Sequence, residues 1–172
     1  MRTKDLSRQL RAWERRYSGA EERPLGSYGI LMGLYATSVG AMVAAARARG
    51  ARAPERLAGT DLALLTVGTF RASRLITKDS VTSFVRAPFT RYEGSAGEGE
   101  VQEAVAGRGL RHAAGELVSC PFCIAVWLAS VGMFGMIVFP RAARTVCSTL
   151  AVVAGSDLLQ YGYSALKELE NQ

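Results

Sequence analysis

Cysteine and histidine are scarce in this chain, which has three Cys and one His among 172 residues. So few cysteines in a chain of this length exclude a small secreted fold held together by disulfides. Lysine is scarce too: 3 of the 21 Lys and Arg are lysine, an arginine bias that fits a GC-rich bacterial genome. The sequence has no Ser-His-Asp set, no phosphate-cradling loop and no paired carboxylates in an apolar stretch. No reaction class is indicated, and we favour a protein that is not an enzyme.

Apolar residues make up 49% of the chain, which excludes a disordered protein. They form long stretches, whereas the charges collect at the N-terminus and in the connectors. Crossing a bilayer takes about 20 such residues in a helix. The stretches lack sustained alternation and are rich in Ala, Gly and Leu, which favours helices over strands. We therefore predict an all-α, polytopic membrane protein with three to four transmembrane helices, at about residues 25–46, 61–77, 117–139 and 143–165.

The second stretch is the weakest candidate for a transmembrane helix. Only Leu62 to Phe70 is uncharged, and Arg71 and Arg74 follow. Nine residues are too few to cross, so this helix spans only if the arginines are buried against protein or reach the headgroups. A half-inserted hairpin is the alternative.

The predicted organisation has three parts. Residues 1–24 form a basic amphipathic helix, residues 25–165 a helical membrane domain, and residues 166–172 a tail. The connector at 79–116 divides further: Ser80–Tyr92 mixes aromatics and arginines as an interfacial element would, Gly94–Glu100 is expected to be a flexible acidic loop, and Val101–Ala106 a short helix.

The distribution of Lys and Arg predicts the orientation, because cytoplasmic connectors carry an excess of them. With four spans and a cytoplasmic N-terminus, fifteen cations lie on the cytoplasmic side and six outside. We therefore expect a bacterial inner-membrane protein with both termini in the cytoplasm. Four arginines in the first connector oppose this orientation. We expect no cleaved signal peptide, because the first apolar run begins only at Leu25 and is too long.

The net charge of +6 suggests anionic lipid headgroups as partners rather than nucleic acid, because a basic cytoplasmic rim is common in membrane proteins. Leu6, Leu10, Trp13 and Tyr17 recur at spacings of four, three and four. They share one face of a helix that lies in the headgroup plane or docks into a partner.

A small-residue face on the first span, which includes the GxxxG of Gly29 and Gly33, allows close helix packing. It serves equally well within one chain or in a homodimer. Another membrane protein is a third partner that the sequence leaves open.

The segment with the most chemical character is Ser119-Cys120-Pro121-Phe122-Cys123. Ser119 suits an N-cap and Pro121 a first helical turn, which predicts Cys120 and Cys123 on one helix face near the positive end of the helix dipole. Three interpretations stay open: a packing pair, a redox dithiol, or half of a zinc site that a second copy completes. The cofactor is therefore undetermined, with zinc as the candidate. Cys147 is expected to pack in the interior.

A second group of candidates is cationic. Arg71, Arg74 and Lys78 lie three and four residues apart, which predicts one helix face, and Asp79 follows them. Asp157 in the last span is expected to pair with Arg71 or Arg74, because an unpaired charge inside a membrane is costly. A structural ion pair, a headgroup or anion site, and an ion-transport path are the alternatives.

Two segments resemble a family of small bacterial membrane proteins, domain-of-unknown-function 1360. One is FRASRLITKD at 70–79 followed by VRAPF at 85–89, and the other is ELVSCPFCIAVW at 116–127. The resemblance covers roughly Asp61 to Asp157. It implies that the arginine-rich helix and the cysteine helix belong to one unit, and it implies no reaction.

The leading hypothesis is a non-enzymatic membrane interaction or scaffold protein with a site at the cytoplasmic face. A membrane thiol-redox or metal-thiolate protein and a small-ion transporter are the alternatives. The candidate functional residues are Arg71, Arg74, Asp79, Cys120, Cys123 and Asp157.

Overall fold

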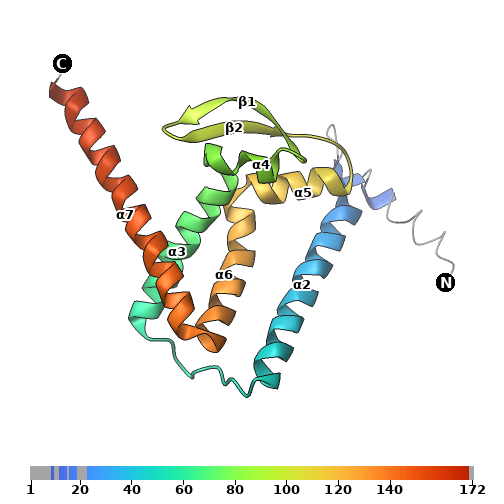
Figure 1. The fold of residues 1–172 in the computed structure, drawn as a ribbon. Coiled ribbons are helices and arrows are strands. Elements are labelled where there is room, and N and C mark those ends of the chain that lie inside the picture. The colour runs from blue at the N-terminus through green and yellow to red at the C-terminus, as the bar shows by residue number, and fades with distance from the viewer. Residues whose placement is uncertain (1–8, 10–11, 15, 19–22, 171–172) are drawn as a thin grey trace. The chain divides into compact units, whose positions relative to one another are not determined.

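The computed structural model describes residues 9, 12–14, 16–18 and 23–170. Its elements in chain order are α2 (Leu25–Ala48), α3 (Gly59–Thr77), η1 (Ser80–Thr82), α4 (Ser83–Arg86), β1 (Thr90–Gly97), β2 (Glu100–Val105), α5 (Leu110–Ser119), α6 (Pro121–Val138) and α7 (Pro140–Glu170), shown in Figure 1. The chain is mostly helical, as predicted. Leu6 and Leu10 of the predicted N-terminal amphipathic helix lie outside the described residues, so that helix stays a prediction.

The structure divides into two compact units. The connector unit consists of Met1–Gly40 and Thr77–Cys120, and the helix unit consists of Ala41–Ile76 and Pro121–Gln172. Helix α2 runs through both. Each unit is considered by itself below.

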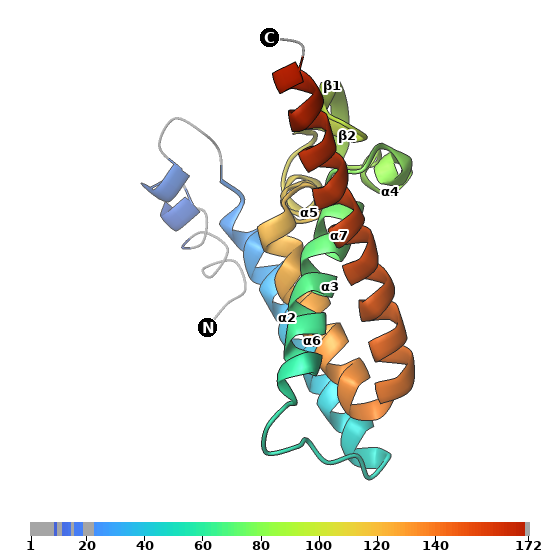
Figure 2. The ribbon, with the colours of Figure 1, turned by 90° about the vertical axis from the view of Figure 1, so that its left-hand side faces the viewer.

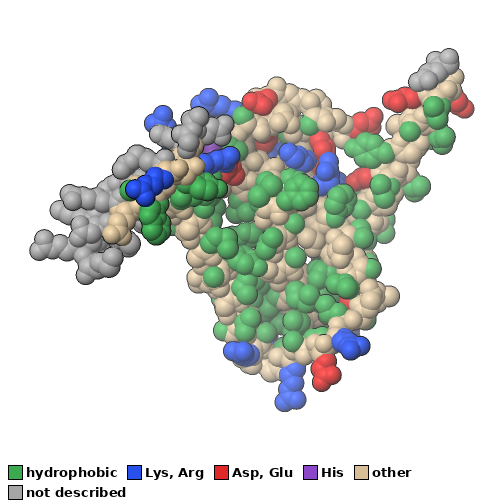
Figure 3. All heavy atoms as spheres, turned by 180° about the vertical axis from the view of Figure 1, so that it is seen from behind, with side chains coloured by type: hydrophobic (Ala, Val, Ile, Leu, Met, Phe, Trp, Pro, Cys, Tyr) green, Lys and Arg blue, Asp and Glu red, His purple; other side chains and the backbone are tan. Residues whose placement is uncertain are grey.

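Three helices in the described residues, α2, α6 and α7, are long and apolar enough to cross a membrane, judged by length and composition. Helix α2 has no buried residue, and α6 buries only Met136. Figure 3 shows many hydrophobic side chains at the surface of the molecule. Helix α3 has 19 residues, a length of about 28 Å, but with the charged residues Asp61, Arg71 and Arg74 along it, it is not one of these three helices.

In the helix unit, α3 and α7 run in the same direction and α6 runs in the opposite direction (Figures 1 and 2). One buried residue from each helix forms the core: Leu65 of α3, Met136 of α6 and Cys147 of α7. Partly buried Leu64, Met133 and Ala143 pack around them. Cys147 therefore has the packing environment that the sequence predicts for it.

Helix α3 comes very close to α7 at Gly68. A Cβ added to Gly68 would lie 3.2 Å from Cys147 Cβ and 3.3 Å from Cys147 Cα. The second contact is with backbone, so a larger side chain at Gly68 has no flexible neighbour to displace. The absence of a side chain at Gly68 is what permits this approach.

The predicted helix at 117–139 is wrong at its beginning. Helix α5 ends at Ser119, Cys120 is extended with φ −104° and ψ 112°, and α6 begins at Pro121. The proline ring disfavours helical backbone in the residue before it, so the helix breaks at Cys120. Ser119 is thus the last residue of α5 rather than an N-cap. At its other end this helix stops at Val138, one residue before the predicted end, and Pro140 begins α7, in keeping with the preference for proline in the first helical turn.

The expected acidic loop and short helix at 94–106 are also wrong, because this segment forms an antiparallel hairpin. Thr90 pairs with Val105 and Gly97 with Glu100. Gly97 and Gly99 have φ values of +138° and +76°, so these glycines provide the backbone of the turn rather than flexibility. The all-α prediction therefore holds for the membrane-length segments but misses a two-stranded sheet.

Gly68→Val should destabilise the helix unit by about 1–3 kcal/mol, the usual cost of overpacking a close contact. Thermal unfolding in detergent, followed by circular dichroism, measures this. The control is Gly155→Val on α7, because a Cβ at Gly155 meets no atom within 4 Å while the change in helix propensity is the same. Equal destabilisation by both variants would contradict a close contact at Gly68.

Candidate functional site

An ion pair joins the beginning of α3 to the beginning of α7. Arg144 Nε donates to Asp61 Oδ1 and Arg144 NH2 donates to Asp61 Oδ2, each at 2.7 Å. Asp61 is buried. This two-pronged geometry matches the planar guanidinium to both carboxylate oxygens, which fixes orientation as well as distance.

A second ion pair joins the same two helices further along. Arg71 Nε lies 3.0 Å from Asp157 Oδ2, one of the two pairings that the sequence predicts for Asp157. The Arg71 side chain is 14% exposed and that of Asp157 is 39% exposed. The Asp157 carboxylate is therefore paired with Arg71 and also exposed at the surface of the helix unit.

The two pairs have opposite polarity. At Asp61 the acid is on α3 and the base on α7, whereas at Arg71 the base is on α3 and the acid on α7. The contact of Gly68 with Cys147 lies between them along both helices. Reversing α7 against α3 would bring like charges together, and sliding it would separate the opposite charges, so the pairs specify one direction and one register.

Sequence reasoning missed the Asp61–Arg144 pair. Asp61 is the first residue of the predicted span at 61–77 and Arg144 the second residue of the predicted span at 143–165, and neither is predicted to be the partner of the other. The signal available was that both stretches carry an acid as well as arginine: Asp61 with Arg71 and Arg74 in one, and Asp157 with Arg144 in the other. Only the packing of α3 on α7 shows which charges meet.

The other predicted cationic residues are not all on one helix face. Arg74 is on α3, but the helix ends at Thr77, so Lys78 and Asp79 lie beyond it. The carbonyl oxygen of Lys78 accepts a hydrogen bond from the Val101 amide at the end of the hairpin. Asp79 and Cys120 belong to the connector unit, whereas Arg71, Arg74, Cys123 and Asp157 belong to the helix unit.

A buried arginine organises the connector unit. Arg86 is fully buried, and its Nε donates to Glu103 Oε2 on β2 at 2.7 Å. Its NH1 donates to Thr82 Oγ1 at 2.9 Å and its NH2 to the Asp79 carbonyl at 3.0 Å. NH2 also reaches Ser83 Oγ, so one guanidinium ties η1, α4 and β2 together.

Glu103 is held as a carboxylate by this network. Burial raises the pKa of Glu103, but the hydrogen bonds and charge of Arg86 and the hydroxyls of Thr90 and Ser83 outweigh it, and the pKa lies below its ordinary value of 4.5. Thr90 Oγ1 donates to Glu103 Oε2 at 3.1 Å. The hairpin therefore depends on the ionised form of Glu103.

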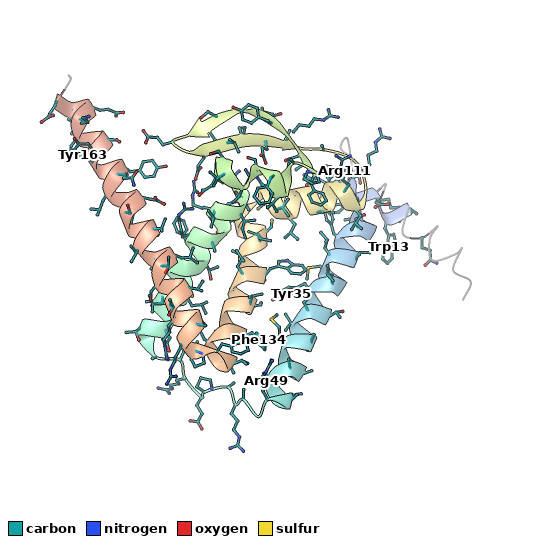
Figure 4. The ribbon with its side chains drawn as sticks, viewed as in Figure 1. Trp13, Tyr35, Arg49, Arg111, Phe134 and Tyr163 are labelled. Atoms are coloured by element: carbon teal, nitrogen blue, oxygen red, sulfur yellow. The ribbon has the colours of Figure 1, made fainter. Side chains whose placement is uncertain are left out.

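A second polar cluster in the connector unit centres on Glu116 of α5. Arg23 NH1 donates to Glu116 Oε1 at 2.6 Å, and the Tyr28 hydroxyl of α2 donates to Oε2. His112 Nε2 lies 3.5 Å from Glu116 Oε1. This glutamate thus attaches the first turns of α2 to α5. Elsewhere on α5, the Arg111 side chain, labelled in Figure 4, donates from Nε to the Pro88 carbonyl at 2.8 Å.

The cysteines are reduced thiols in three environments: Cys123 is exposed, Cys120 is partly buried and Cys147 is buried. Cys120 precedes α6 and Cys123 is in its first turn. The prediction that both cysteines lie on one helix face is therefore wrong. No group of three or more His, Cys, Asp and Glu side chains suited to a metal occurs in the described part of the chain.

Comparison with known proteins places the two resembling segments in one family. The model of the family described as protein of unknown function DUF1360 matches residues 64–163, more than half of the chain. This chain belongs to the DUF1360 family. The match includes Arg71, Arg86, Glu103, the cysteine pair and Asp157, as the sequence resemblance implies.

Two relatives of this DUF1360 protein come from Bacillus subtilis (strain 168). Sporulation protein YjcA is 29% identical over 105 residues, which cover 59% of this chain and 89% of YjcA. The UPF0713 protein YngL is 27% identical over 108 residues, 62% of this chain and 80% of YngL. No solved structure matches the chain.

Asp61→Asn should lower the thermal midpoint of the protein in detergent more than Asp157→Asn does. Asp61 is buried and accepts two short hydrogen bonds, whereas Asp157 is partly exposed at a longer distance. Glu168→Gln on the exposed end of α7 is the control and should leave the midpoint unchanged. Exchanging both partners, Asp61→Arg with Arg144→Asp, should recover part of the loss; no recovery would argue against the pairing.

Acid should selectively loosen the connector unit. Because the pKa of Glu103 is lower in the folded state, its contribution is fully present above about pH 4.5 and is lost as the pH falls through the folded pKa. Hydrogen-exchange protection of β1 and β2, corrected for the intrinsic exchange rate, should show this loss.

Glu103→Gln should cost about 3–5 kcal/mol at neutral pH, because Arg86 is left buried without its counter-charge, and should abolish this pH dependence. Glu93→Gln on the exposed side of β1 should behave like the unmodified protein.

Proposed function

We propose that this chain is a polytopic protein of the bacterial inner membrane that serves as a non-enzymatic interaction scaffold, with its connector unit at the cytoplasmic face. The observation that carries the proposal is the pairing of charges on α3 with charges on α7. Paired charges cost far less in a membrane than isolated ones. The pairing therefore supports α3 as a fourth span beside the apolar helices α2, α6 and α7.

The directions of the helices support an even number of crossings. Within the helix unit, α3 and α7 run one way and α6 the other. Arg49, just after α2, has its guanidinium 5.3 Å from the ring centroid of Phe139 at the turn between α6 and α7; Arg49 is labelled in Figure 4. This contact supports α2 ending on the side where α6 ends and α3 begins. Four crossings put both termini on one side, and the excess of Lys and Arg favours the cytoplasm.

The environment of the candidate residues favours a scaffold over transport or thiol chemistry. Arg71 and Asp157 hold two helices together, and Cys147 is a core residue. A transport path would need Asp157 to exchange partners, which would weaken the attachment of α7. The proposed partners are anionic headgroups at residues 1–24 and either a second copy or another membrane protein. A zinc site shared by two copies through Cys120 and Cys123 is the competing model.

Single-cysteine labelling tests the topology. In a chain with Cys120→Ser, Cys123→Ser and Cys147→Ala, one cysteine is introduced at Arg52, Ser95 or Lys167, and intact bacterial cells are treated with a membrane-impermeant maleimide. Arg52→Cys should react in intact cells, and Ser95→Cys and Lys167→Cys only after permeabilisation. Labelling of Ser95→Cys in intact cells would overturn the orientation. Labelling of Ser95→Cys and Lys167→Cys on opposite sides would overturn four spans.

The same cysteine-free chain separates a scaffold from a metal-thiolate or redox protein. A scaffold should keep its abundance in the membrane and its oligomeric state in mild detergent without Cys120 and Cys123. About half an equivalent of zinc per unmodified chain, lost together with its oligomer in the cysteine-free chain, would instead establish a shared thiolate site.

A further inference from the structure

The short segment formed by η1 and α4 has its charged residue inside and its apolar residues outside. Arg86 is fully buried, whereas Val81 and Phe84 are each 76% exposed and Val85 is 42% exposed. A segment folded only for water would bury the phenylalanine and the valines and expose the arginine. We call Val81, Phe84 and Val85 the apolar tip.

The polar network explains how this inversion is maintained. Arg86 is held by Glu103 of β2 and by the Asp79 carbonyl, and Thr82 and Ser83 supply further acceptors. These bonds fix the backbone of η1 and α4, so that the tip side chains project away from the unit. The exposure of the tip thus follows from the backbone conformation that the Arg86 network fixes.

The chain limits how far the tip can lie from a membrane. Val81 is four residues beyond Thr77, the last residue of α3. A chain extends by at most about 3.6 Å per residue, so Val81 lies within about 14 Å of that helix end and Phe84 within about 25 Å. The other end of the connector unit leads directly into α6 at Pro121. If α3 and α6 span the bilayer, the tip is tethered near its surface.

We propose that the apolar tip inserts into the interfacial layer of the bilayer and so anchors the connector unit to the membrane surface. The proposal rests on the membrane topology proposed above. Phenylalanine and valine suit the boundary between headgroups and acyl chains, and the exposed Ser80 beside them can hydrogen-bond to headgroups. The charge of Arg86 is neutralised internally by Glu103, so the attachment is hydrophobic rather than electrostatic.

Tryptophan fluorescence in vesicles tests the insertion. In the full chain with Trp13→Phe and Trp127→Phe, Phe84→Trp places one reporter at the tip, and Tyr92→Trp places one on β1, where Tyr92 is 69% exposed. The proteins are reconstituted in phosphatidylcholine–phosphatidylglycerol vesicles whose acyl chains are brominated near the headgroup. Phe84→Trp should emit at shorter wavelength than Tyr92→Trp, lose most of its emission to the brominated lipid, and resist acrylamide in the water.

Two results would overturn the insertion. Emission and acrylamide quenching equal to those of Tyr92→Trp would place the tip in water, and shielding from both acrylamide and bromine would place it against protein, such as a second copy.

Trp127, kept as the single tryptophan on α6, reports separately on the proposed membrane topology. Quenching of Trp127 by lipid brominated deep in the chains, without quenching at position 84, rejects tip insertion alone; no quenching of either residue rejects both proposals. If the tryptophan variants do not fold, Phe84→Cys and Tyr92→Cys in the cysteine-free chain, each carrying an environment-sensitive fluorophore, give the same comparison.

Discussion

The ion pair of Asp61 with Arg144 and that of Arg71 with Asp157 are the interactions on which the helix unit depends. They lie on either side of the approach of Gly68 to Cys147, where Gly68 contributes no side chain between the helices. Small residues let the backbones come close, and the charges then select the direction and register in which they do so. Without this pairing, α3 would be too polar to share the surroundings of its apolar neighbours. Two carboxylates and two guanidinium groups therefore fix how α3 and α7 pack within the helix unit.

The connector unit uses the same principle on a smaller scale. Arg86 and Glu103 form a buried ion pair, and the other donors of the Arg86 guanidinium are satisfied by hydroxyls and a carbonyl. Such a pair contributes specificity more than net stability, because removing both charges from water offsets much of their attraction. Its structural effect is to hold η1 and α4 against β2. The consequence is a surface on which apolar side chains take the places that charged ones would normally occupy.

The sequence predicted the bounds of α2 and α3 well and the connector poorly, for one physical reason. Long apolar runs are a strong local signal, and the bounds of α2 and α3 differ from the prediction by no more than two residues at either end. The strand β2 was predicted to be helical because its inward-facing position is Glu103, so that it lacks the alternation of apolar and polar residues typical of a half-buried strand. That glutamate can face inward only because Arg86 meets it, and this partner is seventeen residues away. The break at Cys120 was missed because Pro121 was treated only as a favourable first-turn residue, although it also constrains the residue before it.

What the sequence by itself determined is therefore the helical character, three membrane-length apolar helices and the family, since these follow from local composition and short motifs. It also identified Arg71 and Asp157 as charges that need a partner. Only the tertiary structure decided which charges meet, because a pairing such as Asp61 with Arg144 joins residues 83 positions apart. The same holds for the outward position of Phe84 and the inward position of Arg86, since burial is decided by the surroundings that the fold provides and not by the polarity of one side chain.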